Sequence, residues 1–150
     1  MLEIGKQILA QQPFSVLMGA ELVAFSQGHT ELRIPVRSDL MQQHGFVHGG
    51  VIGYAADTAL AFTGGSVLGP EVVTLEFKVN YLRPVIGDFM VARAYVLYSS
   101  RNQAVCRCDI FVSREGKEVF CATAQGTIAM MGRPSNSNQD SSAVLGGGQD

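Results

Sequence analysis

An apolar segment bracketed by two glycine pairs, Gly49-Gly50 and Gly64-Gly65, constrains the fold of this chain more than any other feature. It reads GGVIGYAADTALAFTGG, and Asp57 is its single charged residue. A helix with apolar residues on all sides is typical of a buried helix, because no face of it is suited to water. We therefore predict a buried helix over residues 49–65, around which the rest of the chain builds a core.

Strand patterns lie on both sides of this helix in the sequence. Before it, we predict a short N-terminal helix over 1–12, strands over 20–26 and 30–36, and a loop over 37–48. After it, four strands are expected over 72–82, 89–98, 104–113 and 117–131. Alternation in the first of these predicts one apolar face, formed by Val73, Leu75, Phe77, Val79 and Tyr81. An antiparallel sheet wrapped around the helix satisfies this order, so we expect an α+β fold.

The composition predicts one domain that associates with copies of itself. The 150 residues suit a single domain over 1–131, and the polar, glycine-rich tail over 132–150 is expected to be disordered. Charged residues make up only 16% of the chain, below the roughly 25% usual in soluble domains. A chain so poor in charge is expected to bury part of its outer surface against a partner, as a homodimer or a homotetramer.

The same composition disfavours two classes of partner. With a net charge of −2 and no long basic run, the chain lacks the electrostatic footprint of a nucleic-acid-binding protein. Its apolar stretches are interrupted by polar residues before they reach the length of a membrane span, and the N-terminus lacks the apolar region of a signal peptide. We expect a cytoplasmic protein with no nucleic-acid and no membrane partner.

The cysteines and histidines predict neither a disulfide framework nor a zinc site. The cysteines are odd in number, with a single C-x-C pair: Cys106, Cys108 and Cys121. The histidines lie far from them in the sequence: His29, His44 and His48. We expect the cysteines to be small apolar core residues on strands, and we expect no metal site.

Asp57 is the first candidate functional residue. An ionised carboxylate is costly to bury unless it is paired or hydrogen-bonded. In a structural interpretation, the carboxylate bonds to strand backbone or to a Thr hydroxyl and so fixes the packing. In a functional interpretation, it is a general base or a nucleophile in a poorly hydrated site. Thr74, on the polar face of the first long strand, either orients a water or Asp57, or is only a strand former.

The residues before the helix form the second candidate site. Free N–H groups and the positive end of the helix dipole meet at His48, Gly49 and Gly50. Glycines let a ligand approach those N–H groups, which suits an anion or an oxyanion. Alternatively, the two glycines only permit a tight turn and His48 caps the helix. Gln42, in the preceding loop, either donates to a carbonyl oxygen or is solvated.

The spacing of these two sites predicts an oligomer. Gly49 and Asp57 are eight residues apart, which is about 12 Å along a helix at about 1.5 Å per residue. One small reacting group cannot touch both within a single chain. If both take part, Asp57 of one subunit faces the glycine pair of another, and a two-fold axis creates two equivalent sites.

The stretch from Gln42 to Asp57, QQHGFVHGGVIGYAAD, resembles the signature of hotdog-fold acyl-CoA thioesterases of the PaaI-like, phenylacetate-degradation group. The resemblance continues through VTLEFKVNYLRPVIGD and ends in EVFCATAQGTIAMM, so it covers roughly residues 15–131. It implies a hotdog fold, in which an antiparallel sheet wraps a long central helix. It also implies hydrolysis of an acyl-CoA thioester to a free acid and coenzyme A, with no cofactor besides the coenzyme A of the substrate.

The resemblance implies roles for individual residues. Asp57 is expected to be the general base or the nucleophile, and Thr74 to orient the water from the same subunit. The N–H of Gly49, with that of Gly50, is expected to polarise the thioester carbonyl. His48 matches the histidine of the family and is expected to position the thioester.

Further positions follow from the same resemblance. Gln42 stands where many members carry Asn, which is shorter by one methylene. Arg83 falls where relatives bind the phosphates and pantetheine of coenzyme A, and so does the turn formed by Ser100, Arg101 and Asn102.

Two alternative functions remain open. A hotdog hydratase or dehydratase acting on acyl thioesters pairs a His with an Asp or Glu in one subunit, on a differently spaced motif. A non-catalytic acyl-CoA-binding dimer keeps the fold and the arginines that face coenzyme A, but does not need Asp57.

Overall fold

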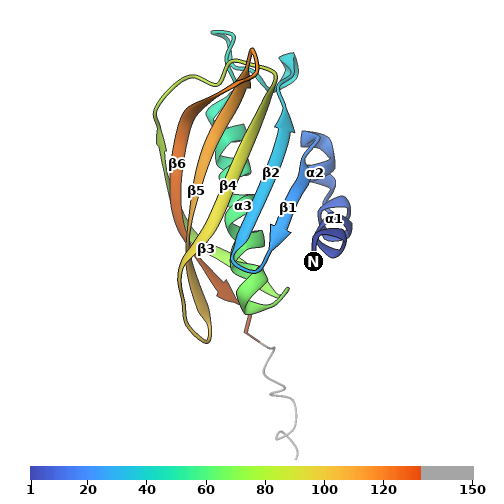
Figure 1. The fold of residues 1–150 in the computed structure, drawn as a ribbon, viewed down its shortest axis with the longest axis vertical. Coiled ribbons are helices and arrows are strands. Elements are labelled where there is room, and N and C mark those ends of the chain that lie inside the picture. The colour runs from blue at the N-terminus through green and yellow to red at the C-terminus, as the bar shows by residue number, and fades with distance from the viewer. Residues whose placement is uncertain (133–150) are drawn as a thin grey trace, which may run out of the picture.

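The computed structural model describes residues 1–132, which form a six-stranded antiparallel sheet wrapped around one long helix (Figure 1). The helices are α1 (Leu2–Ala10), α2 (Pro13–Met18) and α3 (Gly49–Leu68), with a short 3-10 helix, η1 (Ser38–Leu40). The strands are β1 (Glu21–Ser26), β2 (His29–Pro35), β3 (Val72–Tyr81), β4 (Phe89–Ser99), β5 (Gln103–Arg114) and β6 (Lys117–Met130). The expectation for the tail lies, apart from Gly132, outside the described residues.

The strand order places α3 in the middle of the fold. The sheet runs β1-β2-β4-β5-β6-β3, and every neighbouring pair is antiparallel. β3 follows α3 in the sequence but pairs with β6 at the far edge of the sheet, so α3 lies across all the strands and contacts each of them. This arrangement confirms the expected α+β hotdog fold.

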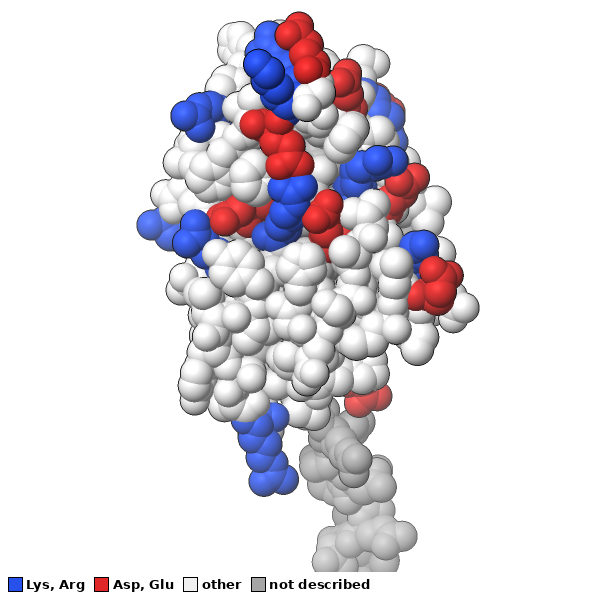
Figure 2. All heavy atoms as spheres, in the orientation of Figure 1, with Lys and Arg blue, Asp and Glu red and all other residues white. Residues whose placement is uncertain are grey.

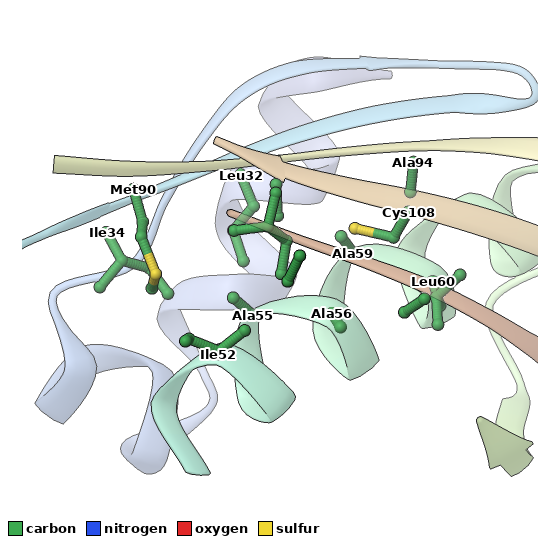
Figure 3. Close-up of a cluster of buried hydrophobic side chains, with 14 of the residues drawn as sticks. Leu32, Ile34, Ile52, Ala55, Ala56, Ala59, Leu60, Met90, Ala94 and Cys108 are labelled. Atoms are coloured by element: carbon green, nitrogen blue, oxygen red, sulfur yellow. The ribbon is translucent and has the colours of Figure 1, made fainter. Parts of the chain in front are cut away.

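Small side chains on α3 let the sheet approach it closely. Ala55, Ala56 and Ala59 are fully buried, and Figure 3 shows them facing side chains of the strands such as Cys108 and Ala94. Leu60 completes this buried surface. Although α3 is long and apolar enough to cross a membrane, 56% of its most apolar stretch is buried inside the protein, as in the core helix of a globular domain.

The three cysteines lie in this core, as expected. Cys106, Cys108 and Cys121 are free and buried. Burial raises the pKa of the Cys106 thiol to about 11 and also raises the pKa of Cys108. A protonated, buried thiol behaves as a small apolar side chain, so these cysteines contribute packing.

A cluster of charged side chains lies on the outer face of the sheet, away from α3. Arg93 donates to Glu31 at 3.0 Å and to Glu118 at 2.7 Å, and its hydrogen bond with Glu118 lowers the pKa of that carboxyl. Figure 2 shows charged side chains concentrated in the upper part of the view and few in the lower part. The helix side of the sheet is mainly apolar, although Thr30 of β2 is buried there.

The predicted alternation of β3 is wrong at its start. The pairing with β6 slips between Thr74 and Glu76, so Leu75 is an extra residue in a β-bulge. Val73 and Leu75 are exposed, at 41% and 56%, whereas Phe77 packs against the core. The bulge reverses which face the side chains occupy, and it puts half-buried Thr74 on the same side as α3.

The sequence did not predict the helical segments α2 and η1, and the helix that it predicted over 49–65 was shorter than the observed α3. Pro13 begins α2 as its first residue, where a proline costs nothing because that N–H has no helical partner, and Gly19 ends α2 at a φ of +66°. The 3-10 helix η1 lies within the expected loop. α3 runs past Gly65 to Leu68, so the second glycine pair does not end the helix.

Alanine substitutions at two adjacent glycines of α3 are expected to have opposite effects on the free energy of unfolding. A Cβ at Gly64 would lie 2.5 Å from the Cβ of Ile128, whereas a Cβ at Gly65 would lie 3.4 Å from Val72. We expect Gly64→Ala to lower the free energy of unfolding by about 1–3 kcal/mol through overpacking. We expect the matched Gly65→Ala to be neutral or to raise it by up to about 1 kcal/mol, because alanine favours a helix. Urea unfolding followed by circular dichroism measures both, and equal destabilisation would contradict the prediction.

Candidate active site

His48 caps the N-terminus of α3. Its Nδ1 accepts a hydrogen bond from the Gly50 N–H at 2.8 Å, and its carbonyl accepts from Val51 at 2.9 Å. A ring nitrogen that accepts a hydrogen bond carries no proton, so the proton of the neutral imidazole is on Nε2. His48 therefore caps the helix, as one of the two interpretations predicted. Its side chain accepts from the Gly50 N–H, so only the Gly49 N–H of the two glycines is left without this partner.

The Gly49 N–H is the remaining donor at this end of the helix. The hydrogen bonds of residues 1–132 include none from this N–H, while the Gly49 carbonyl accepts from the Tyr81 hydroxyl at 3.1 Å. Tyr81 lies beside the Gly49 backbone, so a side chain of β3 supports the first turn of α3. An unpaired N–H at the positive end of a helix is suited to an anion or an oxyanion.

The loop before His48 is held by its own hydrogen bonds. The Gln42 side-chain oxygen accepts from the His44 N–H, and the Gln42 N–H donates to the Phe46 carbonyl at 2.9 Å. Gly45 turns the chain at a φ of +83°, a conformation that few other residues adopt. Gln42 therefore uses its oxygen to close the loop, which leaves its side-chain N–H groups as the only donors it can offer a carbonyl oxygen.

Asp57 carries a buried oxygen without a partner. Its Oδ1 is shielded from solvent and has no hydrogen-bond partner among the described residues. The structural interpretation of Asp57 required a bond to strand backbone or to a Thr hydroxyl, and the hydrogen bonds of the described part of the chain include neither. Because an unpaired buried oxygen is costly, this position favours the binding of a further polar group.

A groove runs past Asp57 on the outward stripe of α3. It is lined by residues of three elements: Gly53 and Asp57 of α3, Phe14 and Ser15 of α2, and Phe77 of β3. The α2 wall is tied to α3, because the Tyr54 hydroxyl donates to Ser15 at 2.6 Å and Phe14 packs edge-on against the Tyr54 ring. Asp57 thus lines a groove between α2 and β3.

The structure brings some of the expected residues together and keeps others apart. Arg83 lines the same hollow as Gly49, and it donates to the Phe120 carbonyl at 2.9 Å. Thr74 lies on the α3 side of β3, but no hydrogen bond in residues 1–132 joins it to Asp57. The turn containing Ser100, Arg101 and Asn102 lies at the opposite end of the sheet from Gly49 (Figure 1).

Sequence reasoning missed the residues that support this site. Tyr81 was expected only as part of the apolar face of its strand, and the hydrogen bond between Tyr54 and Ser15 was not predicted. A tyrosine inside an otherwise apolar helix was the available signal, because a buried hydroxyl usually finds a partner. Groups of three or more His, Cys, Asp or Glu side chains close enough to bind a metal ion are absent from the part of the chain that the structure describes.

Comparisons with known proteins place these residues in a family. A family model described as the thioesterase superfamily matches residues 44–119. A protein of Haemophilus influenzae that is named as an esterase is 33% identical over 116 residues. The match covers 76% of this chain and 82% of that protein. The medium/long-chain acyl-CoA thioesterase YigI of Escherichia coli is 23% identical over 141 residues, 83% of this chain and 89% of its own length.

Solved structures agree with the sequence comparisons. A thioesterase family protein from Silicibacter pomeroyi is 34% identical, with a TM-score of 0.81 over 85% of this chain and 96% of its own. A variant of the phenylacetic acid degradation protein PaaI from Thermus thermophilus is 28% identical, with a TM-score of 0.70 over 80% of this chain and 100% of its own.

The cap at His48 predicts a stability effect that depends on the replacement. His48→Ala removes the acceptor for the Gly50 N–H, and we expect it to lower the free energy of unfolding by about 1 kcal/mol. His48→Asn is expected to keep most of that free energy, because asparagine is among the best capping residues. Denaturant unfolding of both variants checks this, and an equal loss in the two would show that capping is not the role of His48 in stability.

Proposed function

This chain belongs to the thioesterase superfamily, whose members hydrolyse thioesters, and from that premise we propose that its substrate is an acyl-CoA. The proposed products are a free acid and coenzyme A. The similarity to an acyl-CoA thioesterase of Escherichia coli supports this substrate class. The single observation that carries the proposal is the unpaired, buried Oδ1 of Asp57 in a groove on an apolar helix.

The carbonyl oxygen of the thioester is proposed to bind the Gly49 N–H. This donor is free and stands at the positive end of a twenty-residue helix. Negative charge grows on the carbonyl oxygen as the carbonyl carbon is attacked, so a fixed donor there stabilises the transition state more than the substrate. With the Gly50 N–H occupied by His48, Gly49 is the main backbone donor of this oxyanion site, and the Nε2–H of His48 is left to orient the thioester.

Asp57 is proposed to act on that carbonyl from a second protomer. Gly49 and Asp57 are about 12 Å apart along α3, at about 1.5 Å per residue, which exceeds the reach of one carbonyl group. Two copies of α3 packed antiparallel about a two-fold axis place Asp57 of the partner subunit beside Gly49. Such a dimer would also cover the groove and give the buried Oδ1 of Asp57 its partners.

Two chemical routes are compatible with this arrangement. In the first, Asp57 takes a proton from a water molecule while the oxygen of that water attacks the carbonyl carbon. The C–S bond then breaks, and the proton passes to the leaving thiolate. In the second, Asp57 attacks the carbonyl itself, the thiolate leaves, and water then cleaves the mixed anhydride. Thr74, on the α3 side of β3, is proposed to orient the water in either route.

The coenzyme A part of the substrate is proposed to lie at the start of α3. Arg83 lines the hollow beside Gly49, and one nitrogen of its guanidinium is already held by the Phe120 carbonyl. A positioned guanidinium suits a phosphate. The turn containing Ser100, Arg101 and Asn102 is too distant in the same protomer, so its proposed part in binding coenzyme A is played from a different subunit.

Replacing Asp57 tests the catalytic proposal. We expect Asp57→Asn to lower kcat for acyl-CoA hydrolysis by at least about 10²-fold, the range for loss of a general base, with the melting temperature unchanged or raised. Thiol release measured across a panel of acyl-CoAs gives the rate. Turnover close to that of the wild type would contradict the assignment. A protein without turnover that binds acyl-CoA equally well in both forms would instead be a non-catalytic binding dimer.

Replacing Gly49 tests the oxyanion donor and the two-protomer site. Gly49→Pro removes the N–H at a helix position that suits proline, while the matched control Gly49→Ala keeps the N–H. We expect kcat to fall at least about 10²-fold only in the proline variant.

A mixture of the two inactive variants then locates the site. In a mixed dimer of Gly49→Pro and Asp57→Asn, one of the two sites combines an intact Gly49 with an intact Asp57 only if each site spans both protomers. Random mixing is expected to restore about a quarter of the wild-type activity. No recovery in mixtures that size and mass analysis show to contain mixed dimers would refute a site shared between protomers.

A further inference from the structure

A second, apolar groove lies further along α3 than Asp57. It has a volume of about 360 Å³ and is lined by Ile4 and Ile8 of α1, Phe25 of β1, Ala61 and Gly65 of α3, and Val72 of β3. It lies between α1 and the start of β3, as the groove of Asp57 lies between α2 and β3. Cavities of this size and character in proteins hold small apolar ligands.

The two grooves adjoin at one residue. Gln12 lines both of them, and its side-chain oxygen is held by the Ser15 hydroxyl at 2.7 Å. On α3, Asp57, Ala61 and Gly65 follow one another at intervals of four residues, so they lie on one stripe of the helix. A ligand whose reacting carbon is at Asp57 therefore meets Ala61 and Gly65 next.

The groove offers a ligand almost no polar partner. Among the described residues that line it, the polar ones are Met1, which carries the N-terminal amino group, Gln12, whose side-chain oxygen accepts from Ser15, and Ser66. The Ser66 hydroxyl accepts from the Gly28 N–H at 2.8 Å and donates to the Thr63 carbonyl at 2.6 Å, so its hydrogen-bonding capacity is used within the protein. A hydroxylated or charged acyl group would lose its hydration along the apolar walls with few partners to replace it, whereas an alkyl chain would gain by leaving water.

The distance from Asp57 to Gly65 sets the length of the acyl chain that fits along α3. Asp57 and Gly65 are eight residues apart, about 12 Å along the helix. With C–C bonds of about 1.5 Å, an extended alkyl chain advances about 1.3 Å per carbon. About nine carbons therefore reach from Asp57 to Gly65. A ring-shaped or very short acyl group would fill only the start of this stretch and leave the apolar walls at Gly65 in water.

We propose that this groove binds the tail of an unbranched medium-chain acyl group of about eight to ten carbons, and that Gly65 sets its upper length. The inference rests on the proposed acyl-CoA thioesterase activity, which supplies the reacting carbonyl at Asp57. Gly65 has no side chain, and the nearest side-chain atom to a Cβ there is 3.4 Å away, on Val72. A larger residue at this position fits the helix but projects into the groove.

The test compares kcat/KM for decanoyl-CoA with that for butanoyl-CoA. We expect the wild type to prefer decanoyl-CoA, and Gly65→Leu to lower the ratio of the two constants at least about tenfold, since several methylenes lose their place. Ala10→Leu, which adds the same side chain on an exposed site of α1 outside the groove, is the matched control and should leave the ratio unchanged. Because the ratio is taken within one preparation, it does not depend on the fraction of folded protein.

A second variant covers the case in which Gly65→Leu does not fold. Ile8→Ala trims the α1 wall at a partly exposed position and should lower the same ratio. A wild type that prefers butanoyl-CoA or an aryl-CoA, or a ratio unchanged in Gly65→Leu, overturns the groove assignment while the thioesterase proposal stands. The unchanged ratio is also the result expected if a second protomer fills the groove.

The binding of the same two compounds separates this inference from the proposed activity. If the wild type cleaves no acyl-CoA, the proposed activity is wrong. Calorimetric titration with decanoyl-CoA and butanoyl-CoA then tests whether the groove binds the acyl tail. Tighter binding of decanoyl-CoA that is lost in Gly65→Leu supports the groove. Equal binding of the two compounds overturns it.

Discussion

The burial of α3 inside the sheet is the constraint on which the other features of the molecule depend. A twenty-residue helix that is apolar on all sides has no face for water, so the strands must surround it. Ala55, Ala56 and Ala59 keep its inner surface small, which lets the central strands come close. Carrying β3 to the far edge of the sheet completes the wrapping and leaves one stripe of the helix open between α1, α2 and β3.

That open stripe carries the groups to which we assign the proposed reaction. Asp57, the single charged residue of α3, lies on this stripe. Toward the N-terminus of the helix is the Gly49 N–H, which has no partner among the described residues, and toward the C-terminus is the apolar groove that includes Gly65. The same helix therefore supplies a proposed oxyanion donor, a carboxylate and the wall of an acyl groove. Because the donor and the carboxylate are separated by the rise of eight residues, the proposed reaction needs two copies of the helix. The low charge of the chain is consistent with such an interface, since charges gather instead on the outer face of the sheet around Arg93.

Local pattern was enough to locate the helix start and the position of Asp57 within it. Glycines at 49 and 50 after a capping residue, followed by an apolar run, specify a helix N-terminus through interactions between near neighbours. Strand boundaries were also close, because turns are encoded locally. The bulge at Leu75 was not predicted, since it depends on how β3 pairs with β6, fifty residues later in the chain. The second helix was missed for a related reason: Pro13 ends one helix and begins the next, and only the packing of α2 against Tyr54 decides between these outcomes.

By itself, the amino-acid sequence determined the buried helix, the approximate positions of the strands, the family signature from Gln42 to Asp57 and the 12 Å spacing on which the proposed dimer rests, because each follows from periodicity or from residues near one another in the chain. Only the tertiary structure decided that His48 occupies the Gly50 N–H and leaves that of Gly49 free. It alone placed the Ser100 turn at the far end of the sheet from Arg83, and formed an apolar groove between α1 and α3. These features arise where segments distant in sequence meet, and the register and packing that bring them together are properties of the folded chain as a whole.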